Sequence, residues 1–249
     1  MIQNLNFNLF GDYKSLEATP ERISQLLSEM IKKGLNVMPG TFQQINPGLN
    51  MKKFERMQFI NQKDNFSISF NVDSIHINST IIDDKSYNLM KNINKFVFNI
   101  NKVLSSLDNL DEDVPSGSRV SLVVSILHEN QKIKPLTEIY QEFSNSIPLY
   151  EPDKTFEWNS RAVKREENKI LEQDEEFNIV SEVMRTQGEI DRSGEKSVFD
   201  TINTIIDINT LHENTKERID SDFSKEFLEK AVELFSSHYK AIEVKLDVS

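Results

Sequence analysis

The sequence predicts an α+β protein in which antiparallel β-sheets pack against long helices. Residues 5–9 and 66–72 alternate between apolar and polar side chains, which is the period of a half-buried strand. Residues 20–33 and 84–107 carry apolar side chains at steps of three and four, which is the period of an amphipathic helix. Several predicted strands follow one another without a helix between them, as in an antiparallel meander with one solvent-exposed face.

The first predicted strand covers residues 1–10, where apolar residues alternate with Asn. The next element is a helix, because Thr19 suits the N-cap, Pro20 suits the first helical position and Gly34 suits the end. Residues 35–82 are predicted to be β. Within them the clearest strands are 54–60, 66–72 and 75–82.

A second helix of about 24 residues is predicted to end near residue 107, with Asp83 and Asp84 as its cap. Its apolar stripe suits a coiled-coil or dimer seam, or an ordinary helix that lies across a sheet. Fewer than four heptads are present, which favours the ordinary helix. The acidic segment 108–117 contains Pro115 and is predicted to be a solvated loop between two halves of the chain.

The second half begins with a predicted central strand over residues 119–127, which are apolar and β-branched. Residues 136–143 suit a short helix, and the highly charged residues 151–176 suit an exposed excursion or hinge. Two strands then flank a turn at 191–194. Asp220 begins the last predicted helix.

The halves 1–110 and 111–249, the second with its charged excursion, share a similar order of predicted strands and helices. This order suggests an internally duplicated strand-rich unit that ends in a helix. One continuous domain, with a single antiparallel sheet and helices on one side, fits the same pattern.

Composition excludes several classes of protein. The 249 residues include 40 acidic and 29 basic side chains, a net charge of −11, and no Cys. The lack of Cys excludes disulfide scaffolds, thiolate nucleophiles and zinc ribbons. The acidic balance disfavours nucleic-acid binding. We see neither a signal peptide nor an apolar run long enough to cross a membrane, and therefore expect a cytoplasmic protein.

No catalytic, cofactor-binding or metal-binding residues can be nominated. The four His residues lack partners at metal-ligand spacing: His76, His128, His212 and His238. Phosphate-binding glycine loops and nucleophile motifs are absent. Asp222 with Glu243-Val244-Lys245 faintly resembles the pattern of metal-dependent nucleases, but Glu243 is expected at the end of a helix rather than on a strand. We therefore expect no enzyme and no cofactor.

Two features suggest binding. The first is a candidate partner-binding segment in which aromatic and basic residues are interleaved: Phe156, Trp158, Arg161, Lys164 and Arg165. The alternative interpretation of these residues is a solvated segment whose basic charges are compensated by neighbouring Glu side chains. The second is the set of 16 Phe residues, most of which are expected in the core, whereas several on strands are expected to face outward and some of them to line a peptide groove or a dimer interface. The outward-facing candidates are Phe54, Phe59, Phe66 and Phe70.

The two strands 54–59 and 66–77 resemble a signature of a sporadically distributed, uncharacterised bacterial family. The strand 204–210 and the helix 227–239 resemble the late strand and closing helix of that family. The resemblance implies an α+β protein of this size, encoded near mobile-element or phage-defence genes. It supplies no catalytic residues.

The leading hypothesis is a non-enzymatic interaction protein, accessory or regulatory, that forms a homo-oligomer or binds a protein partner in bacterial antiviral defence or a mobile element. One alternative is a metal-dependent nuclease or hydrolase whose acidic residues converge only in the fold. Another is an acidic mimic of nucleic acid, which requires carboxylates arrayed on one surface.

Overall fold

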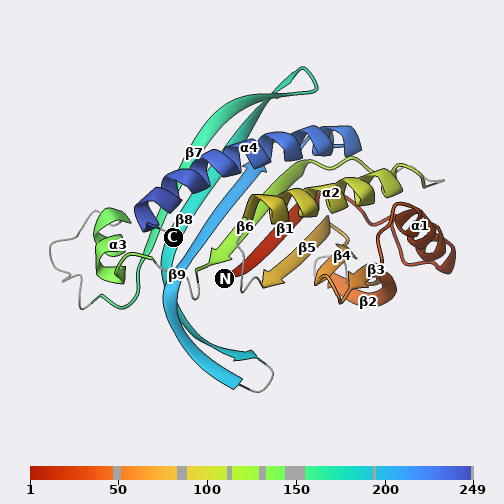
Figure 1. Ribbon diagram of the computed structural model, residues 1–249. Coiled ribbons are helices and arrows are strands. Elements are labelled where there is room, and N and C mark those ends of the chain that lie inside the picture. The colour runs from red at the N-terminus through yellow and green to blue at the C-terminus, as the bar shows by residue number, and fades with distance from the viewer. Residues whose placement is uncertain are drawn as a thin grey trace.

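The computed structural model describes residues 1–46, 52–82, 89–110, 114–128, 133–143, 155–192 and 195–247. These residues form one nine-stranded antiparallel sheet and four helices (Figure 1). The α+β class and the antiparallel pairing are therefore confirmed, in one sheet rather than several. The strands are β1 (Ile2–Phe10), β2 (Met38–Asn46), β3 (Lys52–Asn61), β4 (Phe66–Phe70), β5 (Ser74–Ile82), β6 (Arg119–Leu127), β7 (Asn159–Ile170), β8 (Gln173–Arg192) and β9 (Glu195–Thr210). The helices are α1 (Pro20–Lys32), α2 (Leu89–Leu107), α3 (Leu136–Phe143) and α4 (Ser221–Leu246).

The two halves of the chain meet in the middle of the sheet, whose strand order is β2-β3-β4-β5-β1-β6-β9-β8-β7. Strands β1 and β6 pair antiparallel from Ile2↔Leu127 to Phe10↔Arg119. The connection to β6 passes so close to β1 that a Cβ on Gly117 would lie 2.6 Å from Leu9 Cδ1. Only glycine fits there without displacing its neighbours.

Helices α2 and α4 lie side by side across one face of the sheet (Figure 1). The apolar residues of the strands pack beneath them, because successive side chains of a strand point to opposite faces. Edge-to-face ring pairs join the layers, with centroids 5.2 Å apart for Phe177 and Phe227 and 6.4 Å apart for Phe66 and Phe96. We call this the covered face of the sheet, and the opposite one the open face.

Several local predictions are confirmed. Thr19 caps α1 by accepting a hydrogen bond from the Arg22 amide at 3.2 Å, and Asp220 caps α4 by accepting one from the Phe223 amide at 2.8 Å. Gly34 adopts a φ of 76° just after α1, a conformation that favours glycine. The short helix predicted over 136–143 is α3.

Other predictions need correction. Long helices were predicted, but among the described residues only α4, with 26 residues, is long; α2, α1 and α3 have 19, 13 and 8. Within the charged segment 151–176, predicted as an exposed excursion or hinge, the described residues from 159 form edge strand β7, which is largely exposed, and the start of β8. The predicted cap at residues 83 and 84 lies outside the described residues, as does part of the loop, 111–113.

The expectation that four Phe residues face outward is wrong, since each is at most 3% exposed: Phe54, Phe59, Phe66 and Phe70. The last three share the covered face, as the pairs Phe59↔Ile68 and Phe70↔Ile75 show. They belong to the core because helices cover their side of the sheet.

Strands β8 and β9 extend past the rest of the sheet. From Arg185↔Ile202 to Arg192↔Glu195 they pair with each other, beyond the last pairs that they make with β7 and β6. The result is a curved two-stranded arm (bottom of Figure 1). Among the described residues, no helix is long and apolar enough to cross a membrane.

Candidate functional site

The open face of the sheet is the candidate functional site. On β1, Phe7 points to the covered face, whereas Asn6 and Asn8 point to the open one. The helices that cross the strands, α2 and α4, both lie on the other side (Figure 1). The open face is therefore built from the polar half of each alternating strand.

Strand register aligns polar side chains into one continuous row across this face. Each neighbouring pair is a register pair, and adjacent strands lie about 4.8 Å apart. The row runs through eight strands, and we call it the polar row: Gln58, Ser69, His76, Asn8, Ser121, Asn209, Asn178 and Arg165. Residues that are far apart in the sequence thus form one uninterrupted surface.

Cross-strand hydrogen bonds hold many of these side chains in place. Asn8 Nδ2 on β1 donates to Ser121 Oγ on β6 at 3.0 Å, and within β9 Asn209 Nδ2 donates to Asp207 Oδ1 at 3.0 Å. Beside the row, Ser125 Oγ donates to Asn203 Oδ1 at 3.0 Å. These contacts reduce the rotamer freedom of the polar side chains, so less entropy is lost when a partner binds.

Charge is scarce at the centre of the open face. On β4, β5, β1, β6 and the stretch of β9 that pairs with β6, the only charged side chains directed to this face are Arg119 and Asp207. In the whole chain, 28% of residues are charged. The centre of the open face is therefore a nearly uncharged patch on a protein of net charge −11.

Burial shifts the pKa values of Asp207 and His76 on this patch in the direction that favours their neutral forms. Burial raises the pKa of Asp207, although the hydrogen bond from Asn209 and the charges of Arg119 and Arg161 oppose the shift. Burial also lowers the pKa of His76, with Asp73 opposing it. Both shifts have the same main cause, which is the loss of water around the charged form of the group.

An aromatic cluster adjoins the polar row. The rings of Phe10 and His76 meet edge to face at 6.2 Å, and the Arg119 guanidinium lies 5.1 Å from the Phe10 ring centre. His76 Nε2 and Arg119 Nε are buried without a hydrogen-bond partner among the described residues. Buried unpaired polar atoms are costly, so these two are available to a partner that reaches them.

The five residues nominated from the sequence do not form one cluster. Arg161 and Arg165 point to the open face, opposite Glu182 and Asn178. Lys164 is directed to the other side of β7, where its Nζ lies 2.6 Å from Glu166. Strand alternation separates the basic side chains in this way.

The two aromatic members of that segment also differ. Trp158 is only 8% exposed and packs on Tyr140 at 5.9 Å between ring centres, whereas Phe156 is 68% exposed. Both line a hollow of about 620 Å³ with Met184 and Arg185. Trp158 thus serves mainly to fix α3 against the sheet, and Phe156 is the accessible member.

Sequence reasoning missed the polar row, although a signal was present. Apart from Asp207, the polar positions that face this side of the strands are Asn and Ser, not Lys and Glu, in 4–8, 67–69, 121–125 and 203–209. Among the described residues, no group of three or more His, Asp or Glu side chains is placed to hold a metal ion. The chain matches no protein-family model, no curated protein and no solved structure.

Proposed function

We propose that this chain is a non-enzymatic interaction module that binds a second copy of itself through the open face of its sheet. The observation that carries the proposal is the nearly uncharged patch around the polar row, on an otherwise strongly charged protein. Charged residues are depleted in the cores of protein–protein interfaces, as they are here.

Electrostatics favours this face for self-association. Two copies that each carry a charge of −11 repel one another, and the repulsion is strongest where acidic surfaces approach. Contact through the uncharged patch keeps most of the carboxylates of both copies in solvent. The open face is thus the surface that two copies can bring together at the lowest desolvation cost.

The chemistry of the polar row is self-complementary. Asn and Gln side chains both donate and accept hydrogen bonds, and so do Ser hydroxyls. In a two-fold dimer the same patch faces itself, so each group must be able to bond to its own kind. The six amides and hydroxyls among the eight residues of the polar row satisfy this condition, whereas Lys or Glu side chains would not.

The area of the open face is also sufficient for a specific protein–protein interface. The five strands of the nearly uncharged patch, spaced about 4.8 Å apart and rising about 3.4 Å per residue, cover roughly 600 Å², and the neighbouring strands β7 and β8 extend the open face to roughly 1,000 Å². A standard interface buries about 800 Å² on each partner. The open face therefore has the size of a specific interface without any contribution from the arm.

The test replaces two central, half-buried amides by isosteric carboxylates in the variant Asn6→Asp/Asn78→Asp. The control Asn94→Asp places a carboxylate on the exposed side of α2. Light scattering after size-exclusion chromatography, and sedimentation velocity over a concentration series, should show a dimer for the wild type and the control. The double variant should be a monomer with an unchanged circular dichroism spectrum.

A wild-type chain that stays monomeric at high concentration would overturn the proposal, and so would a dimer that the double variant leaves intact. Added salt sharpens the test. Screening weakens the repulsion between the acidic copies, so the dimer should tighten with ionic strength. A dimer held by surface ion pairs would loosen instead.

The cytoplasmic, bacterial antiphage or mobile-element setting forms part of this proposal through the resemblance of strands 54–59 and 66–77. The wild-type chain and its Asn6→Asp/Asn78→Asp variant can be expressed with their neighbouring genes in a bacterial host. Phage plaque formation should fall with the wild type and recover with the variant. Equal plaque numbers for host, wild type and variant would contradict this setting.

We also propose that the halves are copies of one unit. Both follow the order strand, helix, strands, helix: β1, α1, β2–β5, α2 and β6, α3, β7–β9, α4. Equivalent strands β1 and β6 pair at the centre, flanked by β5 and β9. Sequence profiles of homologues test this idea, because β1 should align with β6; an alignment of β1 with any other strand would contradict it.

A further inference from the structure

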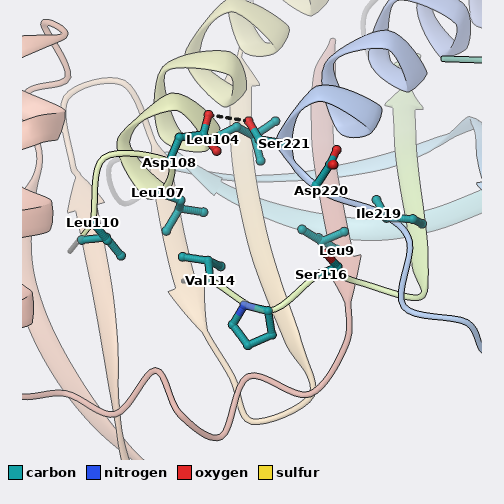
Figure 2. Close-up of a pocket in the computed structure, with 11 residues that line it drawn as sticks. Leu9, Leu104, Leu107, Asp108, Leu110, Val114, Ser116, Ile219, Asp220 and Ser221 are labelled. Carbon is teal, nitrogen blue, oxygen red and sulfur yellow. Dashed lines mark hydrogen bonds between the residues drawn. The ribbon is translucent and has the colours of Figure 1, made fainter. Parts of the chain in front are cut away.

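A cavity of about 430 Å³ lies between α2 and α4, on the side of the sheet opposite the proposed interface (Figure 2). Its walls come from both halves of the chain: the end of β1, the end of α2, the connection before β6 and the start of α4. A cavity of this volume suits a small organic molecule.

The floor of the cavity is aliphatic. Leu104 and Leu107 of α2 face Leu9, Val114 and Ile219 across the hollow (Figure 2). Leu9, Leu104, Leu107 and Ile219 are each at most 5% exposed, so they are held in place by the surrounding core. An apolar body of a ligand would gain free energy by leaving water for this floor.

The mouth is acidic. Asp108 and Asp220 line it, and Ser221 Oγ donates to Asp108 Oδ2 at 2.8 Å (dashed line in Figure 2). Lys225 Nζ lies 3.4 Å from Asp108 and 3.1 Å from Asp222. Asp108 and Asp222 thus share one ammonium group, and Asp220 adds a further carboxylate, which leaves the mouth net negative.

Each lining carboxylate retains an oxygen for a ligand. Asp108 Oδ2 accepts from Ser221 and Lys225, and Asp220 Oδ1 accepts from the Phe223 amide. The second oxygen of each accepts no hydrogen bond from the described residues. The C-terminal end of α2 adds a partial negative charge and the capped N-terminus of α4 a similar positive one, so the two helix dipoles largely cancel and the carboxylates decide the sign.

We propose that this cavity binds a small organic cation: a primary amine with an unbranched apolar body. The ammonium head would donate to Asp108 and Asp220, and the body would lie on the aliphatic floor. The net charge of −11 raises the local concentration of such a cation. This site lies apart from the open face and does not depend on self-association.

Isothermal titration calorimetry and thermal shifts with butylamine, hexylamine and octylamine test the site. Binding should strengthen as the chain lengthens, because each added methylene leaves water. Hexanol and hexanoate, which share the hexyl body, should bind more weakly than hexylamine, and hexanoate should bind least.

Two variants locate the binding. Asp108→Asn removes a mouth carboxylate isosterically and should weaken hexylamine by about tenfold or more, as expected for a lost hydrogen bond to a charged group. Val114→Phe fills the hollow and should abolish binding. The control Asp222→Asn removes the same charge from a residue that contacts Lys225 but does not line the cavity, and should change affinity less than about twofold.

Three results would overturn the proposal: no binding of any amine at millimolar concentration, equal binding of amine, alcohol and carboxylate, or equal loss in Asp108→Asn and Asp222→Asn. If Val114→Phe does not fold, Leu110→Phe fills the same cavity from another position. Measurements on the Asn6→Asp/Asn78→Asp variant keep this outcome distinct from that of the proposed interface.

Discussion

The two faces of the sheet are built from alternate residues of the same strands, yet their side chains differ in kind. On β1, the residues that face α2 and α4 are Leu5, Phe7 and Leu9, all at most 4% exposed. Their neighbours Asn4, Asn6 and Asn8 form the open face. The covered face is a hydrophobic core that stabilises the fold, whereas the open face is polar, hydrogen-bonded and nearly uncharged. The stabilising core and the proposed binding surface thus lie on opposite sides of one layer of backbone.

The largest expected effect compares neighbouring residues on the two faces. Phe7→Ala should lower the free energy of unfolding by about 3–5 kcal/mol, because it leaves a cavity in a fully buried position. Asn6→Ala should change it by less than about 0.5 kcal/mol. Urea unfolding followed by circular dichroism measures both, and similar losses would show that the open face is also part of the core.

A second prediction concerns the buried ion pair on the covered side. Arg218 donates to both carboxylate oxygens of Glu175 at 2.6 and 2.9 Å, and these side chains are 13% and 7% exposed. Arg218→Met should cost about 3 kcal/mol, because Glu175 is left buried without its partner. The double variant Arg218→Met/Glu175→Gln should recover part of this loss. No recovery would mean that Arg218 acts mainly through the hydrogen bonds that its guanidinium donates to backbone carbonyls, such as that of Ser118.

A third prediction concerns the open face, where a substitution is expected to raise the free energy of unfolding rather than lower it. Since burial raises the pKa of Asp207, the folded chain holds this proton more tightly than the unfolded chain does. The free energy of unfolding therefore falls as the pH rises through the pKa that Asp207 has in the folded chain, because the ionised carboxylate is disfavoured there. Asp207→Asn should raise the free energy of unfolding at neutral pH, by less than the losses above, and should leave it unchanged at acid pH where Asp207 is protonated. Unfolding curves at both pH values measure this, and a neutral-pH loss would contradict it.

The smallest expected effect is at the exposed end of the polar row. Arg165 lies 3.2 Å from Glu213, with both side chains more than half exposed. Arg165→Gln should change the free energy of unfolding by less than about 0.5 kcal/mol, because solvent screens such a pair. A thermal unfolding comparison measures it. A loss as large as that of Arg218→Met would mean that Arg165 is buried by a partner in solution.

Local patterns in the sequence determined the class of the fold and most of its elements. Alternation predicts β1 and β4, and Thr19, Pro20 and Asp220 predict where α1 and α4 begin. These features depend on residues within one turn or one strand of each other, so the local sequence suffices. The strand period also separates the polar and apolar sides of each strand.

The tertiary structure alone decided which side of each strand is covered and how distant strands align. The sequence placed Phe59 and Phe70 outward because it does not reveal where α2 lies. It could not join Ser69 to Asn178 in one row, because that alignment passes through five interstrand registers, several between segments far apart in the chain. Register is selected when the whole core packs, since a shift of one residue would turn every apolar side chain to the wrong face.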